Sequence, residues 1–504
     1  MATVLPGGAK PGRWAELVLL VFALGLSFFA YAQVGVAVTG RLPGQMAVQC
    51  GGFTLLVLVV HLILRWRAPY ADPVIFPVTV LLNGTGLAMI YRLGLRYEEI
   101  GADPGPVIAY KQLIWTVLGL VAAAVTVIWL RDHRSLRRFT YTAMILGLVG
   151  LILPLAPWIG RNINGSQIWI HLGPLSFQPA ELSKIALAVF FAGYLVTRRD
   201  AMALAGPKIL GLRLPRLRDM GPIMLAWLMS MGVLVFERDL GTSLLLFGLF
   251  VVMIYVATNR PSWIVIGLGL FSGGVVLAYK MFSHVQNRFD IWLHPFSQEL
   301  YAKPLGGSGQ LVQGLFGMAN GGLFGTGLGE GRPDITPLAY SDFIFAALGE
   351  ELGLTGLVAL LLIYLVLVER GFRTAIGIRD GFGKLLATGL AFTLAFQLFV
   401  VVGGVTRVIP LTGLVTPFLA YGGSALLANW IVVALLLRIS DGARRPPPAT
   451  SEIDLGPVLQ AEAAKRALHD AAGSGSSSKA AKPRSGSGLP TPQDGQATEA
   501  VRRP

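Results

Sequence analysis

Apolar runs of about 20 residues recur along this chain of 504 residues, and they limit the folds that it can adopt. A run of that length crosses the hydrocarbon core of a bilayer as a helix. Hydrophobic residues make up 54% of the chain and charged residues 13%, against about 25% charged in soluble domains. With one cysteine, Cys50, no intramolecular disulfide can form. The sequence therefore predicts an all-α polytopic membrane protein.

The hydropathy pattern predicts twelve transmembrane helices. They cover residues 15–37, 46–64, 74–95, 109–130, 139–159, 180–197, 220–236, 240–257, 262–281, 343–368, 385–406 and 414–437. Alternate loops between these spans are rich in Lys and Arg, and by the positive-inside rule both termini are cytoplasmic. The formal net charge of +14 is thereby explained by topology and contact with membrane lipids, so we do not expect nucleic acid as a partner.

The chain divides into regions of different composition. Residues 1–13 are a short cytoplasmic N-terminus, and residues 14–440 carry the spans. Residues 441–504 are rich in Pro, Ser, Gly, Ala and Lys, which predicts a disordered cytoplasmic tail. Residues 282–342, between the ninth and tenth spans, are too long for a simple connection. Their aromatic and apolar content predicts a structured extracytoplasmic loop.

A glycine-rich stretch at residues 321–329 superficially resembles a phosphate-binding loop. The stretch lacks the Walker lysine and the strand-to-helix context, so a nucleotide site is rejected. Two interpretations remain open. The glycines either permit tight turns and close helix packing, or they let the backbone approach a ligand.

Carboxylates lie at the start of the tenth span and inside it. Asp342 can cap the helix, or Ser341 can cap it and leave the Asp342 carboxylate free. Glu350 and Glu351 lie within the apolar span, where carboxylates are costly and often functional. Glu350 would lie on nearly the same helix face as Asp342, about 12 Å deeper. A structural, hydrogen-bonded carboxylate is the alternative for Glu350.

Other ionisable residues fall on the same side of the predicted bundle. Glu181 and Lys184 are spaced i,i+3, so they can pair, either as a structural ion pair or as part of a site. Asp239 opens the eighth span, and Arg407 ends the eleventh. Together with Asp342, these residues predict a charged cavity in the outer half of the membrane, which suits an anionic, membrane-borne substrate.

Four motifs resemble those of the SEDS family of cell-wall polymerases (shape, elongation, division and sporulation proteins). They are residues 177–184, residues 239–243, residues 341–346 with 350–353, and residues 410–413 with 417–424. The resemblance extends from about residue 74 to 440. The chain is most similar to the form of this family that has two additional N-terminal helices. It implies a peptidoglycan glycosyltransferase of the plasma membrane that polymerises lipid II, the disaccharide-pentapeptide on undecaprenyl pyrophosphate, in cell elongation and shape maintenance.

The resemblance also implies roles for particular residues. The family's essential aspartate corresponds to Asp342, and its paired cavity residues correspond to Glu181 and Lys184. Gln310 and Gln313 keep the register of a loop motif whose aspartates and tyrosine are missing here. A class B penicillin-binding protein, which would supply the transpeptidase, is the implied partner.

The expected reaction is an inverting displacement of undecaprenyl pyrophosphate, with Asp342 as the base that takes a proton from the acceptor sugar hydroxyl. Arg288 and Arg407 are candidate clamps for the leaving pyrophosphate. A divalent cation, Mg²⁺ or Mn²⁺, can share that role, although no clear ligand cluster is visible. The alternative function is a flippase for lipid-linked intermediates, which would need no base. A scaffold for the transpeptidase is a third hypothesis, but it leaves the intramembrane carboxylates unexplained.

Overall fold

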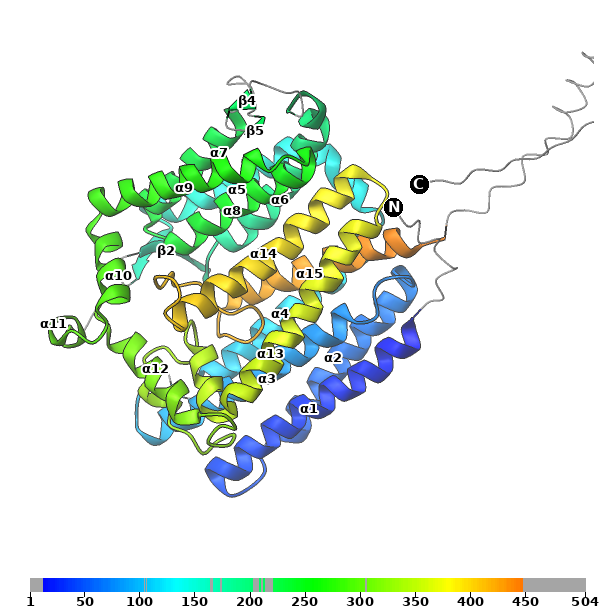
Figure 1. Cartoon of the computed structure of the whole chain (residues 1–504). Coiled ribbons are helices and arrows are strands. Elements are labelled where there is room, and N and C mark those ends of the chain that lie inside the picture. Colours follow the sequence, from blue (N-terminus) through cyan, green and yellow to red (C-terminus); the bar gives the residue numbers. More distant parts are fainter. Residues whose placement is uncertain are drawn as a thin grey trace, which may run out of the picture. The chain divides into compact units, whose positions relative to one another are not determined.

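A computed structural model describes residues 12–103, 105, 107–163, 166–172, 175–202, 208–209, 212–213, 221–303 and 306–446. These residues form a bundle that is mainly helical (Figure 1). Eleven helices in the described ranges are long and apolar enough to cross a membrane. They are α1 (Arg13–Thr39), α2 (Met46–Arg67), α3 (Ile75–Glu99), α4 (Val107–Trp129), α5 (Thr140–Ile152, extended by the 3-10 turns His133–Phe139 and Leu153–Leu155), α6 (Ala180–Met202), α8 (Leu240–Thr258), α9 (Ser262–Met281), α13 (Ile344–Gly377), α14 (Gly381–Val405) and α15 (Gly423–Arg444).

The remaining predicted span, residues 220–236, is occupied by the shorter helix α7 (Gly221–Gly232). A π-helical turn, η4 (Val233–Glu237), continues it and ends at Arg238, which has a left-handed backbone with φ 57°. Eleven of the twelve predicted spans thus coincide with helices long enough to cross a membrane. The count of twelve and the orientation of the termini stay predictions.

The last predicted span, residues 414–437, begins too early. The chain leaves α14 at Val405 and re-enters a helix only at Gly423. Pro410 and Pro417 lack backbone donors, and Gly413 has a φ of 80°, so this stretch cannot continue a helix. We call residues 406–422 the extended segment. Irregular backbone between membrane helices is tolerated where it is buried in protein or lines a cavity, which marks this region for attention.

Short strands interrupt the otherwise helical chain. Strands β1 (Gly160–Ile163), β2 (Ser166–Leu172) and β3 (Leu175–Phe177) form an antiparallel sheet in that order, with Ile170 opposite Phe177. A two-residue pair, β4 (Lys208–Ile209) and β5 (Leu212–Arg213), follows α6. The hydropathy pattern did not predict these strands, because apolar runs of about 20 residues indicate only membrane-spanning helices. Strand β3 leads directly into α6, which carries Glu181 and Lys184.

The predicted loop at residues 282–342 is structured, as expected. It contains helices α10 (Ser283–Leu293), α11 (Gln298–Tyr301) and α12 (Gly309–Gly321) and the 3-10 turn η5 (Pro333–Ile335). The predicted tail, residues 441–504, begins within the last turn of α15. From residue 447 onward the tail lies outside the described residues, as do residues 1–11 of the N-terminus.

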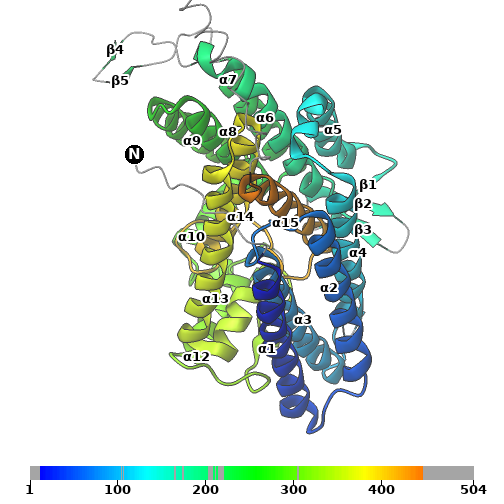
Figure 2. The ribbon, with the colours of Figure 1, turned by 90° about the vertical axis from the view of Figure 1, so that its right-hand side faces the viewer.

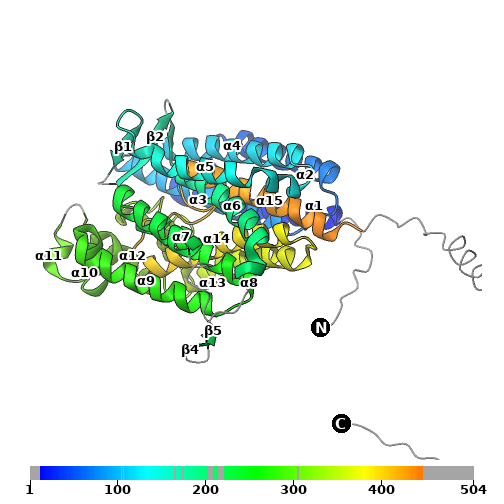
Figure 3. The same cartoon turned by 90° about the horizontal axis from the view of Figure 1, so that it is seen from above.

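The helices pack in neighbouring pairs, of which α1 with α3 and α4 with α15 run parallel. Helix α1 lies along α3, α4 along α15, α5 along α6, and α13 along α14 (Figures 2 and 3). In α15, 89% of the most apolar window is buried, against 28% in α1 and α2. Helices α14, α15 and α6 therefore form the interior of the bundle, and any polar side chain on them must find a protein partner or a ligand. We call the end of the bundle that carries α10 and α12 the loop end.

Candidate functional site

A buried lysine joins three central helices near the start of α6. The Lys184 ammonium lies 2.5 Å from the Glu181 carboxylate, as the i,i+3 spacing predicted. Lys184 also donates hydrogen bonds to Gln397 of α14 at 3.0 Å and to Asn429 of α15 at 3.4 Å. Gln397 in turn donates to the carbonyl of Val415 in the extended segment at 2.9 Å. The lysine thus fixes α6 to the interior of the bundle.

Asp239 caps α8 and links it to α6. Its carboxylate accepts hydrogen bonds from the backbone amide and the hydroxyl of Thr242, at 2.9 and 2.7 Å, and from the amide of Gln178 at 3.4 Å. Burial raises the pKa of Asp239, the bonds from Thr242 oppose that rise, and the nearby charge of Glu181 adds to it. The Asp239 carboxylate is therefore electrostatically coupled to the Glu181–Lys184 pair.

Asp342 lies in the turn that precedes α13, and it is not the helix cap. The N-cap position is Phe343, and no side chain accepts a hydrogen bond there, so the prediction that Asp342 or Ser341 caps the helix was wrong. The Asp342 side chain is half-buried, and its carboxylate has no side-chain hydrogen-bond partner within the described part of the chain. Protein atoms nevertheless surround the Asp342 carboxylate, and this burial raises the pKa of Asp342 to about 6.

Arg288 of α10 lies between two of these carboxylates. Its guanidinium donates to the carbonyl of Leu411 at 3.3 Å. Burial lowers the pKa of Arg288, while the charges of Asp342 and Asp239 raise it. Arg288 forms no direct ion pair with either carboxylate in the described residues. We call Asp342, Arg288, Asp239, Glu181 and Lys184 the Asp342 cluster, because each is close enough to the next for their charges to interact.

Tyrosines hold the turn that carries Asp342. The carbonyl of Tyr340 accepts a hydrogen bond of 2.7 Å from the backbone amide of Tyr421, at the end of the extended segment. The Tyr340 ring packs edge-on against Tyr421 and against Tyr97 of α3, with centroid separations of 5.7 and 6.0 Å. The position of Asp342 is thus set by contacts with α3 and with the extended segment.

Glu350 and Glu351 face the glycine-rich stretch instead of Asp342. The Glu350 carboxylate accepts hydrogen bonds from the backbone amide of Arg332 at 2.9 Å and from Asn320 at 3.3 Å. Glu351 accepts from Arg92 of α3 at 2.8 Å and from the backbone amide of Gly329 at 3.1 Å. The placement of Glu350 below Asp342 was therefore wrong, and its structural alternative agrees with these contacts.

The glycines of this stretch allow backbone to pack on backbone. A Cβ atom on Gly325 would lie 2.2 Å from the carbonyl oxygen of Glu351, and one on Gly353 would lie 2.2 Å from the Gly325 nitrogen. Gly353 has a φ of 68° and breaks the helical geometry of α13 at this contact. Of the two interpretations left open by the sequence, the geometry favours tight turns and close packing.

This packing gives a first prediction. Gly325→Ala should destabilise the loop end by more than 1 kcal/mol, because the new methyl group overlaps the Glu351 carbonyl and because φ is 81°. Gly40→Ala is the control: its backbone is left-handed, with φ 70° and ψ 5°, but the space around it is open, so it should cost only about 1 kcal/mol. Thermal unfolding in detergent measures both. Equal losses for the two variants would contradict the packing argument.

Three predicted residues lie apart from the Asp342 cluster. Arg407 is exposed and donates to the carbonyls of Trp292 and Leu293 at 2.9 and 3.1 Å, at the end of α10. It lines a separate open groove of about 590 Å³. Gln310 donates to the carbonyl of Pro337 at 3.0 Å, whereas the buried side-chain oxygen of Gln313 has no partner. Arg407 contacts the C-terminal end of α10, the helix that carries Arg288, and a pyrophosphate clamp formed by the two arginines stays a prediction.

Sequence reasoning missed several polar residues around the cluster. Gln397 and Asn429, which hold Lys184, interrupt apolar spans, and that interruption was a usable signal. Glu237 is buried beside Asp239, and neither carboxylate oxygen has a hydrogen-bond partner. Burial, helped by the charge of Asp239, raises the pKa of Glu237 to about 8. No sequence pattern distinguished Glu237 from an ordinary loop carboxylate.

The same residues were tested for a metal site. Across the described ranges, no three His, Cys, Asp or Glu side chains are grouped so that they could hold a metal ion. Arg288 supplies positive charge between Asp239 and Asp342, where a cation would otherwise be expected. Mg²⁺ often binds one or two carboxylates together with substrate phosphates, so the divalent cation stays a prediction.

Comparison with known proteins gives close similarities. The statistical model of the FtsW/RodA/SpoVE family, described as cell cycle protein, matches residues 73–445. Peptidoglycan glycosyltransferase RodA of Mycobacterium tuberculosis strain H37Rv is 52% identical over 435 residues, covering 86% of this chain and 92% of the relative. The RodA of Mycobacterium leprae is 48% identical, with 86% and 91% covered. Stage V sporulation protein E of Bacillus subtilis is 34% identical, with 74% and 98% covered.

Solved structures of related proteins superpose on this chain. A chain from a structure of a peptidoglycan synthase complex, described in terms of coordinated polymerization and crosslinking, superposes with a TM-score of 0.60 at 27% identity, covering 74% of this chain and 98% of that chain. RodA of Thermus thermophilus, a rod shape determining protein, superposes with a TM-score of 0.53 at 26% identity, covering 75% and 98%. The family model begins at residue 73, so α1 and α2 precede the residues that it covers.

Proposed function

This chain belongs to the FtsW/RodA/SpoVE family and is a peptidoglycan glycosyltransferase, and from that premise we propose that it polymerises lipid II at the Asp342 cluster. One observation carries the proposal. Asp342 is a half-buried carboxylate that has no side-chain hydrogen-bond partner in the described structure and lies near the Arg288 guanidinium. A base must be free to accept a proton, and a diphosphate needs a cation nearby.

The proposed step is a single inverting displacement. Asp342 takes the proton from the 4-hydroxyl of the acceptor sugar, and the hydroxyl oxygen forms a bond to the anomeric carbon of the donor. The bond between that carbon and the diphosphate oxygen breaks, and its electron pair leaves with undecaprenyl pyrophosphate. Arg288 is placed to offset the negative charge that develops on the diphosphate. No step requires a resident metal ion.

Lys184 and Glu181 position the site in this proposal. Both side chains are buried, and Lys184 is occupied by Glu181, Gln397 and Asn429. The lysine therefore holds α6, and with it the Gln178 contact to Asp239, in register with α14 and α15.

The raised pKa of Asp342 predicts a pH dependence. The base works only when deprotonated, so the polymerisation rate should be half-maximal near pH 6 and should fall about tenfold per pH unit below it. The folded-state pKa is raised, so protonation of this group favours the fold, and its contribution to stability is lost as pH rises through 6. Protonation of Asp342 does not destabilise the fold, so unfolding caused by this group cannot explain a lower polymerisation rate at acidic pH. Initial rates from pH 4.5 to 8 test this, and a flat profile between pH 5 and 7 would contradict it.

The orientation and the partner are part of the proposal. The chain is a multi-pass membrane protein, and we place its loop end on the extracytoplasmic side of the plasma membrane, because the opposite loops carry the excess of Lys and Arg. A class B penicillin-binding protein is the proposed partner, supported by the similarity to a peptidoglycan synthase complex. Its role in cell elongation is supported by the RodA relatives.

Reconstitution in liposomes separates polymerase from flippase. The chain is supplied with fluorescent lipid II, alone and with its cognate transpeptidase, and both glycan strands and movement of lipid II across the bilayer are measured. We expect strands, in greater yield with the partner. Translocation of lipid II without strand formation, with the partner present, would overturn the proposal in favour of the flippase.

A further inference from the structure

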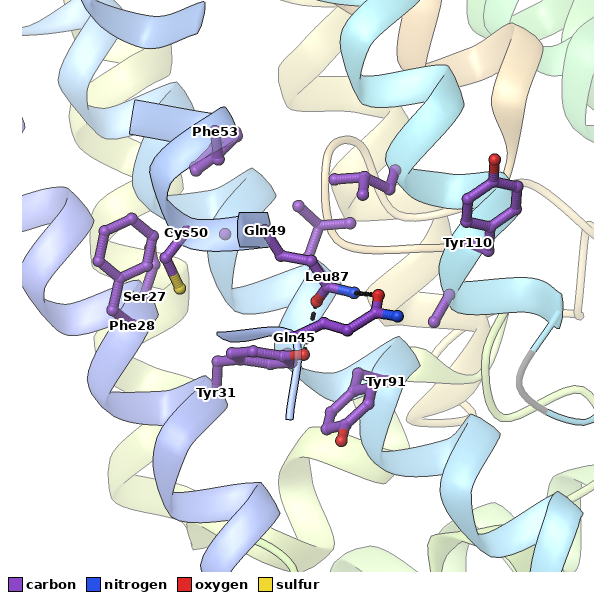
Figure 4. A pocket seen from close by; sticks show the side chains of 14 residues that line it. Ser27, Phe28, Tyr31, Gln45, Gln49, Cys50, Phe53, Leu87, Tyr91 and Tyr110 are labelled. Atoms are coloured by element: carbon purple, nitrogen blue, oxygen red, sulfur yellow. Dashed lines mark hydrogen bonds between the residues drawn. The ribbon is translucent and has the colours of Figure 1, made fainter. Parts of the chain in front are cut away.

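A chamber of about 230 Å³ lies between the first four helices, away from the Asp342 cluster (Figure 4). Helix α1 packs along α3, and α2 packs along α4, so a gap remains where α1 and α2 face each other. Half of the residues in the chamber wall therefore come from α1 and from the start of α2, which both precede the family match at residues 73–445. The chamber is a property of this chain's additional helices.

The lining is graded from polar to apolar. Toward the loop end, the Tyr31 hydroxyl donates to the Gln49 side-chain oxygen at 2.5 Å, and the Gln49 amide reaches the Gln45 oxygen at 3.5 Å (Figure 4). Phe28 and Phe53 are among the apolar side chains of the wall. No charged residue lines the chamber. A ligand that fits this lining has an aliphatic chain that ends in an uncharged group able to form hydrogen bonds.

The polar part of the lining lies toward the end of α1 and at the start of α2, where spans of this length would leave the hydrocarbon core. Tyr31 is eight residues before the end of α1, about 12 Å along the helix, and Gln45 and Gln49 are at the start of α2. The apolar wall continues from there toward the middle of the membrane. Ester carbonyls of glycerolipids lie at the boundary between headgroups and acyl chains, which is the level of Tyr31 and the glutamines.

We propose that the chamber binds one acyl chain of a glycerolipid from the leaflet at the loop end, with the ester group hydrogen-bonded by Gln45 and Gln49. The volume is below the roughly 300 Å³ of the smallest drug-sized pockets, which suits a single chain. A polyprenyl diphosphate would bring charge to a wall without cations, so the substrate lipid is not the expected occupant. This inference uses the proposed orientation only to name the leaflet, and it does not depend on the glycosyltransferase reaction.

The only cysteine of the chain, Cys50, lines the chamber and reports its occupancy without any mutation. The chain is purified in lauryl maltoside, and its alkylation by N-ethylmaleimide is followed by mass spectrometry while dioleoylphosphatidylglycerol is added. At a lipid concentration about ten times the dissociation constant, about one tenth of the chambers remain empty, so alkylation should slow about tenfold. Gln49→Leu should raise the lipid concentration required for protection.

A matched control corrects for shielding by the micelle. The double variant Cys50→Ser, Val48→Cys places the only thiol on the exposed side of α2, two residues away, where Val48 is 77% exposed. Protection of Cys50 but not of this control, by the glycerolipid and not by undecaprenyl phosphate, supports the proposal. Equal protection of both thiols, protection by undecaprenyl phosphate, or no protection of Cys50 would each overturn it.

Discussion

Asp342→Asn should lower the rate of glycan polymerisation by about 10²–10⁴-fold, the usual contribution of a positioned general base. The amide keeps the shape of the side chain but cannot take a proton from the acceptor hydroxyl. Asp342 has no side-chain hydrogen-bond partner in the described structure, and an amide oxygen can still accept the hydrogen bond from the backbone of Asp342, so the substitution should leave the fold intact. The loss would therefore belong to the chemical step. It should appear in the rate with lipid II saturating, with and without the transpeptidase partner.

Stability gives an independent check on this variant. Burial raises the pKa of Asp342 because it destabilises the ionised carboxylate, which predominates at neutral pH, so a neutral amide should leave the unfolding temperature unchanged or higher. Glu330→Gln is the control, since Glu330 is an exposed carboxylate of the same loop, and it should retain full activity. A folded Asp342→Asn variant with near-normal polymerisation would remove Asp342 from the role of base.

The sequence identified Asp342 and the Glu181–Lys184 pair because their signals are local. A charged residue at the edge of an apolar run is visible without any tertiary structure, and an i,i+3 pair on a helix needs only helical geometry. The spans followed from length and hydropathy, which the bilayer imposes on every crossing helix. The structured loop followed from its aromatic content. These features depend on short stretches of chain, so one sequence was sufficient.

Features that depend on distant backbone were not predictable in the same way. Glu350 was placed on the face of Asp342 by assuming that one helix contains both residues, but α13 begins only at Ile344, and the Glu350 carboxylate is bonded to the backbone of Arg332. The pairing of Arg288 with the region of Asp239 and Asp342 joins three separate elements, and residue spacing contains no such information. The extended segment was hidden inside an apolar run that hydropathy assigned to a helix.

Breaking the ion pair between Arg92 and Glu351 should destabilise the protein by about 3–5 kcal/mol, because either partner alone would be left as a buried, unpaired charge. Both side chains are at most 2% exposed, and the guanidinium lies 2.8 Å from the carboxylate. Arg92 also donates to the carbonyl of Gly331 at 2.6 Å. The pair thus fixes the glycine-rich stretch to α3. Arg92→Met and Glu351→Leu should each lower the thermal unfolding midpoint by many degrees.

The double variant Arg92→Met, Glu351→Leu distinguishes a coupled pair from two independent residues. With no charge left unpaired, its loss of stability should be clearly smaller than the sum of the single losses, and the difference measures the coupling. Arg373→Met is the control, because this arginine is 68% exposed and pairs with Glu369, which is one turn earlier on α13 and 37% exposed. A surface pair of that kind contributes about 0–1 kcal/mol. Strictly additive losses in the Arg92–Glu351 cycle would show that the two residues stabilise the loop end separately, and the glycine-rich stretch would then be held mainly by its backbone contacts with Glu350 and Gly353.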